Sequence, residues 1–310
     1  MDGVKRNLVY GACILSAGIT GLSFLFSKVA LNYSDPLDLS AHRFTAAFLC
    51  VLALNLFKGV ELDFDKKTII KLFPLAMLFP VAFFIFQAFG LQYASSSEGG
   101  IIQSVSPILT MILASYFLKE KTTLFQKISI LLSVLGVIYI TVKTGASFDF
   151  SNLKGIFLLL LSALAYSGYS VLARKLSKDF SSAQMSNMMT MLSFVIFNLL
   201  ALGNHLLKGT IGSFFAPFKE VNFIVAVLYL GLLASFGTTF LHNYTLSEIE
   251  ASKMIVFSNL TTVISIIAGV IFLKEKVFYY HIIGSILIVG GVLGTNLLDE
   301  NSLQKYNAPK

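Results

Sequence analysis

The sequence has few charged residues. Asp, Glu, Lys and Arg make up only 13% of the 310 residues, whereas 56% are hydrophobic and the mean hydropathy is +0.80. About a quarter of the residues of a soluble domain are charged. The chain therefore has too little polar surface to cover a water-soluble globule, and its composition indicates a membrane protein.

Cysteine is scarce and tryptophan is absent. Cys13 and Cys50 both lie inside apolar runs, so we expect neither a disulfide framework nor a cysteine-based metal site. A net charge of +7 would suggest a nucleic-acid partner in a soluble protein. In a membrane protein, Lys and Arg in short loops orient the spans and meet anionic headgroups. We expect a lipid environment and no metal, other cofactor or nucleic-acid partner.

Signatures of catalysis are missing too. The sequence contains no H-E-x-x-H, no G-x-S-x-G, no P-loop and no paired carboxylates inside an apolar run. No catalytic residue is therefore assigned, although an intramembrane enzyme acting on lipid or peptide through an unfamiliar site stays an alternative. A membrane scaffold or sensor is a further alternative, which only an assay can test.

What the sequence does contain is a series of ten apolar runs. Each approaches the roughly 20 residues that a helix needs to cross the hydrocarbon core. The runs lie at about 8–31, 38–57, 69–92, 99–118, 124–142, 153–176, 183–207, 221–246, 251–273 and 277–298. A barrel would need alternation with a period of two, which is absent. The sequence predicts an all-α polytopic membrane protein with ten transmembrane helices.

A duplication relates the two halves of the chain. The pentapeptide F-L-K-E-K occurs at 117–121 and again at 272–276, and a shift of 155 positions lays 86–142 on 241–297 without a gap. Each half holds five spans, an odd number, so the halves enter the membrane from opposite sides. This pattern predicts an inverted repeat, an architecture typical of secondary transporters.

The repeats also define the predicted domains. We expect a first repeat at residues 8–142, a second at 153–297 and a polar cytoplasmic tail at 298–310. The two F-L-K-E-K copies are interpreted as interfacial turns at the ends of spans four and nine, one on each side of the membrane. They mark the inversion rather than a chemical site.

The distribution of basic residues predicts the orientation. With the N-terminus inside, fifteen of the 23 Lys and Arg residues fall on the inner side and eight on the outer side. The second F-L-K-E-K copy argues the other way, because parity places it outside. We expect the cytoplasmic membrane as the location, both termini in the cytoplasm and the link around Ser147 outside.

Small residues predict one helix contact. Ser129, Ser133 and Gly136 lie on one face of span five, and Gly284 and Gly291 lie in the equivalent span ten. Small faces let helices approach closely in lipid. We therefore expect spans five and ten to pack against each other as support rather than as part of the transport pathway.

A set of ordered motifs carries a family resemblance. It comprises G-I-T-G-L-S-F-L-F-S-K-V-A-L at 18–31, S-D-P at 34–36, A-H-R-F-T-A-A at 41–47, A-S-S-S-E-G-G-I at 94–101, S-P-I-L-T at 106–110 and the F-L-K-E-K turn. Together with the duplication, these motifs resemble the EamA family of the drug/metabolite transporter superfamily, over residues 8–142 and 153–297. The resemblance implies a ten-helix inverted-repeat fold with a substrate cavity near the bilayer centre. It also implies a carrier that exports amino acids or other small metabolites.

The second repeat departs from this pattern at two positions. Pro107 is replaced by Thr262, and Glu98 is replaced by Lys253. We expect Lys253 to pair with Glu248 or Glu250 instead. These departures weaken any inference about the substrate, which the sequence does not name.

Neutral polar residues at mid-depth are the candidates for the substrate cavity. They are Gln87, Gln103, Ser106, Tyr166, Tyr169, His242 and Asn259. The shift of 155 maps Gln87 onto His242 and Gln103 onto Ser258, beside Asn259. A polar group in hydrocarbon needs a partner, so each faces another helix or water. Interhelical hydrogen bonding is the alternative for any one of them.

Three residues are candidates for a gate or hinge. Lys28 and Arg43 lie near the outer ends of spans one and two, as an outer gate or a docking charge for an anionic group. Anchoring near Asp35 and Asp38 is the alternative. Pro107 removes a backbone hydrogen bond in mid-membrane and is the candidate hinge.

Proton coupling has a narrow basis in the sequence. No carboxylate lies deep within a span, so coupling would require His42 or His242, whose imidazoles titrate in the useful range. Facilitated export of a small-molecule substrate down its gradient needs no ion site and is the alternative. The sequence does not determine the oligomeric state.

Overall fold

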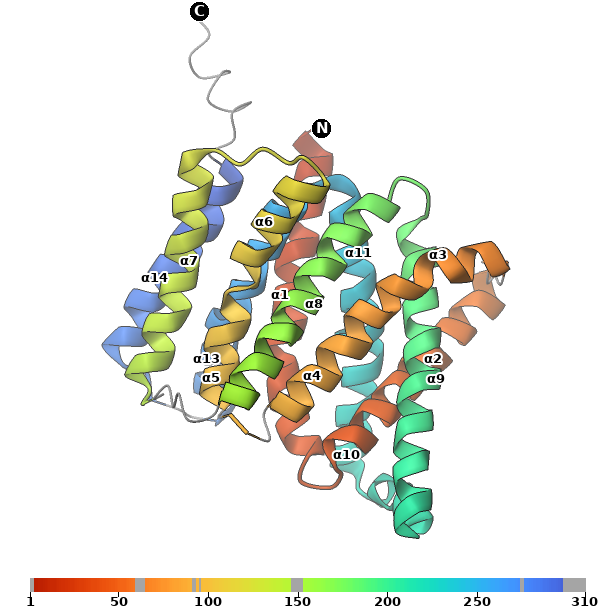
Figure 1. The fold of residues 1–310 in the computed structure, drawn as a ribbon. Helices are drawn as coiled ribbons and strands as arrows, with labels where there is room; N and C mark the ends of the chain where they lie inside the picture. The colour runs from red at the N-terminus through yellow and green to blue at the C-terminus, as the bar shows by residue number, and fades with distance from the viewer. Residues whose placement is uncertain are drawn as a thin grey trace, which may run out of the picture. The chain divides into compact units, whose positions relative to one another are not determined.

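The computed structural model describes residues 3–58, 65–90, 93–94, 96–145, 153–273 and 276–297 (Figure 1). These residues form helices and turns, with no strand among them. Ten segments are long and apolar enough to cross a membrane, which confirms the predicted all-α polytopic class. Their bounds agree with the sequence to within a few residues; the third runs from Lys66 to Gln87 and the eighth from Val221 to Glu248.

Several spans are built from more than one helical segment. In chain order the segments are α1 (Gly3–Ala30), α2 (Pro36–Lys58), α3 (Lys66–Ala76), η1 (Met77–Ala82), α4 (Phe83–Gly90), α5 (Ser96–Ser104), α6 (Ser106–Phe117), α7 (Leu124–Lys143), α8 (Leu153–Leu176), α9 (Ser182–Lys208), η3 (Ile211–Ser213), η4 (Ala216–Lys219), α10 (Val221–Leu228), η5 (Tyr229–Gly237), α11 (Thr238–Glu248), α12 (Ala251–Met254), η6 (Ile255–Asn259), α13 (Leu260–Leu273) and α14 (Tyr279–Leu297).

The chain forms two compact units. The first unit comprises Met1–Ala82 and Leu176–Ser247, and the second comprises Phe83–Lys175 and Glu248–Lys310. Each unit thus takes spans from both halves of the sequence, and the third span is divided between them after Ala82. The predicted repeats at 8–142 and 153–297 describe the duplication of the sequence, whereas the compact units describe which helices pack together.

The irregular spans have local causes. In the third span, the helical path breaks at Phe79 (φ −140°, ψ 128°), next to Pro80, which has no backbone N–H to donate. The fourth span is divided at Val105, and Pro107 lies in the first turn of α6. The eighth span contains a π-helical segment from Tyr229 to Gly237, with α-helix on either side. Interruptions of this kind free backbone groups for other partners, and π segments are frequent at functional sites.

Aromatic and amide contacts between α2 and α9 organise the core of the first unit. The rings of Phe44 and Phe197 stack with centroids 5.1 Å apart, and those of Phe48 and Phe194 stack at 4.6 Å. Between the same two helices, Asn198 Nδ2 donates a hydrogen bond of 2.9 Å to Thr45 Oγ1. The polar pair therefore fixes the register of two helices that otherwise meet through apolar surfaces.

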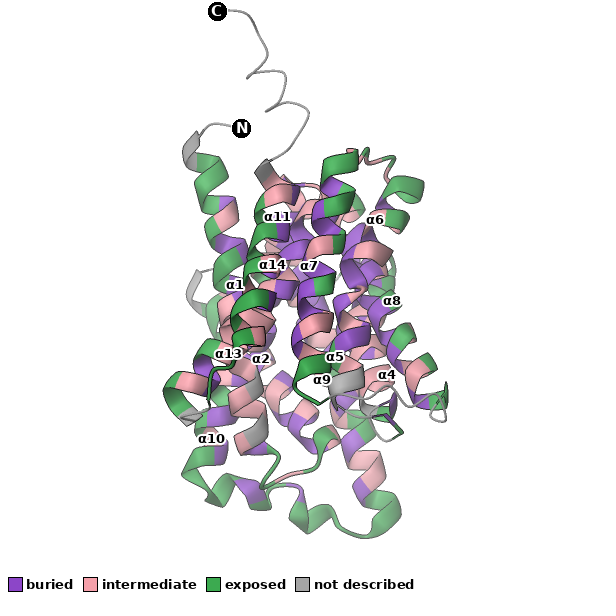
Figure 2. Cartoon of the chain, turned by 90° about the vertical axis from the view of Figure 1, so that its left-hand side faces the viewer, coloured by how far each residue is buried: buried purple, intermediate pink, exposed green. Residues whose placement is uncertain are grey.

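In the second unit, α7 and α14 lie side by side (Figure 1). A Cβ atom added to Gly136 would lie 2.8 Å from the Gly284 carbonyl oxygen, and one added to Gly291 would lie 2.5 Å from the Ser129 oxygen. The helices therefore approach as closely as glycine allows, which confirms the predicted packing of spans five and ten. Figure 2 shows buried and exposed residues alternating along the helices, as expected where one face packs and the other faces outward.

Candidate functional site

The second unit contains a connected group of predicted cavity residues around the break in the fourth span. Gln103 Nε2 donates to Ser106 Oγ over 3.1 Å, and the hydroxyl of Ser167 in α8 donates to the Ser106 carbonyl oxygen over 3.1 Å. Ser106 is fully buried, whereas Gln103 is half-buried. Beside the break at Val105, a neutral hydrogen bond from Ser167 therefore connects span six to span four.

Two buried tyrosines of α8 extend this group. The rings of Tyr166 and Tyr169 lie 6.0 Å apart, and the ring of Phe83 in α4 lies 5.6 Å from that of Tyr166. Ser162 donates to the Phe83 carbonyl oxygen over 2.9 Å. Gln87 is half-buried one turn further along α4. The arrangement offers amide and hydroxyl groups beside aromatic surface, the combination that positions a small amphipathic ligand.

Asn259 lies elsewhere in the second unit, at the end of η6. It is buried and its Nδ2 donates to Ser133 Oγ of α7 over 2.9 Å. This is the interhelical hydrogen bond that the sequence left open as an alternative. Ser133 also belongs to the close contact with Gly291. A role of Asn259 in substrate contact stays a prediction.

His242 belongs to the first unit, in α11, and is half-buried. Its neighbour Asn243 is fully buried and donates to Ser186 Oγ of α9 over 2.9 Å. The predicted cavity residues are thus distributed over both units, with His242 in the first and the other six in the second. That they line one cavity stays a prediction.

Of the gate and hinge candidates, Arg43 has the clearest surroundings. Its Nε donates to Ser235 Oγ over 2.9 Å, and its second guanidinium nitrogen reaches the Ala234 carbonyl oxygen at 3.4 Å. Both partners lie in the π-helix η5. Lys28 lies in α1, but its side chain is outside the described part of the structure. Pro107 is buried at the start of α6.

The sequence analysis missed a buried hydrogen bond between a carboxylate and an imidazole in the first unit. Asp38 in the first turn of α2 accepts a 2.9 Å hydrogen bond from His205 Nε2 in the last turn of α9. The other ring nitrogen of His205 lies 2.8 Å from Thr210 Oγ1. The only available signal was an ionisable residue about one turn inside the end of each span, with nothing to pair two positions 167 residues apart.

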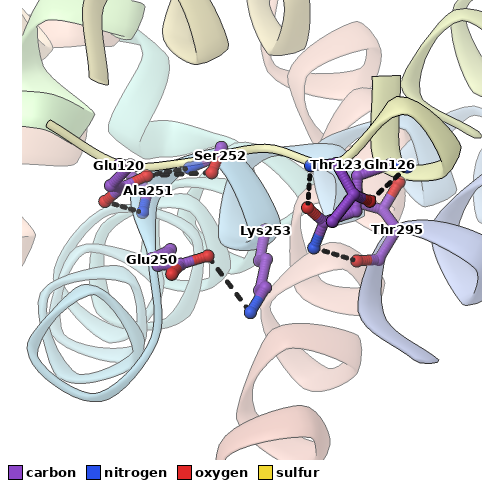
Figure 3. A network of polar contacts seen from close by, with 8 residues as sticks. All are labelled: Glu120, Thr123, Gln126, Glu250, Ala251, Ser252, Lys253 and Thr295. Carbon is purple, nitrogen blue, oxygen red and sulfur yellow. Dashed lines mark hydrogen bonds and ion pairs between the residues drawn. The ribbon is translucent and has the colours of Figure 1, made fainter. Parts of the chain in front are cut away.

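The first F-L-K-E-K turn is more than an interfacial marker. Glu120 Oε1 accepts from the Ala251 N–H over 3.0 Å, and Oε2 accepts from the Ser252 N–H and hydroxyl over 3.3 and 2.8 Å (Figure 3). A carboxylate thereby caps the start of span nine from the end of span four, where free N–H groups favour negative charge. The structure also pairs Lys253 with Glu250 at 3.1 Å, one of its two predicted partners.

The same turn positions span five. Thr123 and Gln126 form a capping box at the start of α7, and Gln126 Nε2 donates to the Thr295 carbonyl oxygen of α14 over 3.3 Å (Figure 3). Figure 3 shows both sets of contacts along one connecting segment. The segment that joins spans four and five therefore makes hydrogen bonds to the start of span nine and to the end of span ten, all in the second unit.

A groove of about 680 Å³ lies between α13 and α14, and it differs in kind from the polar group above. Its lining is almost wholly apolar and includes Ile267, Ile271, Ile282 and Ile286, all of them exposed. Such a surface suits hydrocarbon rather than a polar metabolite. Among the residues that the structure describes, no group of three or more His, Cys, Asp or Glu side chains could hold a metal ion.

Comparison with known proteins relates both halves of the chain to one family. The model of the EamA-like transporter family matches residues 7–142 and 153–297. The uncharacterized transporter YcxC of Bacillus subtilis (strain 168) is 46% identical over 305 residues, covering 98% of each chain. An uncharacterized transporter of Archaeoglobus fulgidus is 26% identical over 279 residues, which cover 90% of this chain and 95% of the relative.

A solved crystal structure has a similar fold. It matches with a TM-score of 0.79 over 95% of this chain and 98% of the other, at 18% sequence identity. At this identity the likeness shows the fold alone.

Proposed function

The chain belongs to the EamA-like transporter family, and from that premise we propose that it exports a small polar or amphipathic metabolite, such as an amino acid, by alternating access. The observation that carries the proposal is the family match across both halves of a chain with ten membrane-spanning segments. It favours transport over an intramembrane enzyme or a scaffold. In this proposal the two repeats exchange conformations across the cytoplasmic membrane.

The polar group of the second unit supplies the substrate contacts in this proposal. Gln103 and the hydroxyl groups beside it can donate to a carboxylate or accept from an ammonium group. Tyr166 and Tyr169 provide flat apolar surface for the rest of the molecule. The break at Val105, next to Pro107, is the point at which span four is proposed to flex.

The experiment that tests the proposal begins with cells. Metabolite profiling of the medium, with and without the protein, should show one or a few small molecules accumulating outside. The same solutes should then leave proteoliposomes that contain the purified protein. No flux of any solute in either assay would contradict the proposal and favour a scaffold or sensor.

A matched pair of variants links flux to the site. Gln103→Ala removes the amide beside Ser106 and should reduce efflux several-fold while leaving the protein folded. Thr141→Ala is the control, because the Thr141 hydroxyl donates to Val137 in its own helix. Equal efflux from both variants would remove Gln103 from the proposed pathway.

The proposed orientation has a separate test. In a background with Cys13→Ser and Cys50→Ser, a cysteine introduced by Ser147→Cys should react with an impermeant thiol reagent in intact cells. Residue 147 lies outside the described residues, so this expectation rests on the basic residues of the sequence alone. Reaction only after permeabilisation would reverse the proposed topology, with both termini then outside.

A further inference from the structure

We propose that the groove between α13 and α14 is a binding site for one anionic phospholipid, such as a phosphatidylglycerol. An acyl chain lies along the groove, and Lys276 and His281 hold the phosphate at one end of it, the mouth of the groove. This is an interaction surface of the second unit alone. It goes beyond the proposed transport function and does not depend on it.

The groove exists because α14 packs through its opposite side. Gly284 and Gly291 face α7, where an added Cβ atom would lie 2.9 Å or less from the backbone of that helix. The side of α14 that carries Ile282, Ile286 and Leu293 is left 52–66% exposed. A hollow of about 680 Å³ remains between this side and α13, open to whatever surrounds the span.

The polar groups of the groove are confined to the mouth. His281 and Ser285 both line the groove one turn apart on α14, and Lys276 directly precedes Val277, another lining residue. Ser285 lies about 6 Å deeper than His281 along the helix. Beyond Ser285 the lining from α14 is apolar as far as Leu293. A glycerophospholipid has the same order of groups, namely a charged phosphate, ester carbonyls and then hydrocarbon.

The length of the groove matches one leaflet of a bilayer. From His281 to Leu293 the helix rises by about 18 Å, whereas half of the hydrocarbon core is about 15 Å thick. Tyr279, which is 61% exposed, and Tyr280 lie beside the mouth. Tyrosine is enriched at the level of the headgroups, so these rings place the mouth at that level.

The ring of His281 presents a hydrogen-bond donor at the mouth. Its Nδ1 accepts from the Phe278 N–H over 3.2 Å, so in the neutral ring the hydrogen is on Nε2. The shift of 155 maps His281 onto Gln126, which accepts from the Thr123 N–H in the same way but also donates to the Thr295 carbonyl oxygen. No described residue accepts from Nε2 of His281, which is therefore available to a phosphate oxygen.

A lipid fits this groove better than a helix of a second copy. Helices approach closely in lipid through small residues, and Gly284 and Gly291 of α14 are already covered by α7. The groove itself is lined mainly by Ile and Val. A flexible acyl chain can fill an irregular hollow between such side chains, and a lysine at the mouth attracts an anionic headgroup.

The proposal also gives a role to the second F-L-K-E-K copy. Lys276 is its last residue and is exposed, whereas Lys274 and Glu275 lie outside the described residues. This copy opposes the predicted orientation, because its lysines fall on the outer side. Contact with an anionic lipid provides a reason for lysine there besides orientation. A reversed topology would leave the site intact, since the lipid would then come from the other leaflet.

The absence of tryptophan allows a direct measurement. Leu293→Trp places a single fluorophore at the deep end of the groove, and Leu135→Trp places one on an exposed position of α7 outside it. In vesicles, phospholipids with brominated acyl chains quench a tryptophan that they contact. At Leu293→Trp, phosphatidylglycerol should bind on the order of fivefold more strongly than phosphatidylcholine with the same chains. At Leu135→Trp the two lipids should quench equally.

The groups at the mouth are tested in the same background. Lys276→Ala combined with His281→Gln should reduce the preference for phosphatidylglycerol at Leu293→Trp to about one. Lys121→Ala, at the equivalent exposed lysine of the first F-L-K-E-K copy, should leave the preference unchanged. Equal binding of the two lipids at Leu293→Trp overturns the site, and so does an unchanged preference in the double variant.

Two further outcomes are distinguished. If neither lipid quenches Leu293→Trp while both quench Leu135→Trp, protein covers the groove, and cross-linking of two copies through it would replace the lipid. If Leu293→Trp does not fold, the wild-type chain decides. Its unfolding temperature in detergent should rise more with phosphatidylglycerol than with phosphatidylcholine, and the double variant should lose this difference. Equal rises in the wild type overturn the proposal.

Discussion

The two compact units differ in the polar groups that they bury. The first unit buries ionisable side chains, namely Asp38, His205 and His42, each in contact with a partner from another segment. Among the described residues of the second unit, the buried polar side chains are neutral, such as Ser106, Ser133 and Asn259. Glu120 of this unit lies outside the spans and caps the start of span nine.

Neutral and ionisable buried groups have different physical consequences in a membrane protein. Neutral hydrogen bonds and small residues let helices approach closely in lipid without the cost of desolvating a charge. Buried ionisable groups are costly to desolvate, so each needs a hydrogen-bond partner that the fold places beside it. The second unit is therefore built for close packing and, as proposed, for substrate contacts, whereas the first buries ionisable side chains that depend on specific hydrogen-bond partners.

The largest effect should come from the close helix contact of the second unit. Gly291→Ala places a methyl group 2.5 Å from the Ser129 carbonyl oxygen and 2.6 Å from Ser133 Cβ. We expect it to lower the free energy of unfolding by roughly 1–3 kcal/mol. Thermal unfolding in detergent measures this loss.

Gly290→Ala is the control for this change. Its added methyl group would meet only Leu132 Cδ2, at 3.9 Å, so its unfolding temperature should stay near that of the wild type. Equal unfolding temperatures for the two variants would show that α7 and α14 do not approach as closely as glycine allows.

A smaller effect is expected at the F-L-K-E-K turn. Glu120→Ala leaves the N–H groups of Ala251 and Ser252 without their acceptor, which should cost about 0.5–2 kcal/mol of stability. Glu120→Gln retains one carbonyl acceptor and should lose less. Lys121→Ala, at an exposed neighbour, should change nothing measurable. Chemical denaturation distinguishes them, and a loss in Lys121→Ala equal to that in Glu120→Ala would contradict the capping role.

The smallest effects on stability are expected for the substitution of one asparagine in each unit. Asn198 and Asn259 each donate a 2.9 Å hydrogen bond to a hydroxyl of another helix. Removing either amide should cost about 0.6 kcal/mol, as for interhelical hydrogen bonds in other membrane proteins. If Asn259 also contacts substrate, Asn259→Ala alone will reduce efflux from proteoliposomes. Equal efflux from both variants would assign Asn259 to packing only.

Much of the fold could be predicted because its signals are local or repeated. An apolar run of about 20 residues has to cross a bilayer wherever it occurs, so the ten spans followed from length and composition. The contact of α7 with α14 followed from small residues at equivalent positions, because no other side chains would permit that approach. Lys253 pairs with Glu250, one of the two partners that the sequence offered for it.

The candidate site could be predicted from the sequence only in part. Gln103 and Ser106 are three residues apart, and the structure joins them directly. Asn259 was chosen because it lies beside Ser258, the repeat equivalent of Gln103, yet its amide donates to Ser133 of the supporting span. Polarity at mid-depth identifies a residue that needs a partner, but it does not say whether that partner is a helix or a ligand.

By itself, the sequence determined the membrane class, the ten spans, the duplication and one helix contact, because hydrophobicity, period and residue size act over short distances or recur at a constant shift. Only the tertiary structure decided which ends of the spans meet. It brought Asp38 to His205 and Glu120 to Ser252 across 167 and 132 positions. Such pairs depend on the packing of whole helices, since a buried charge takes whichever partner the fold places within hydrogen-bonding distance.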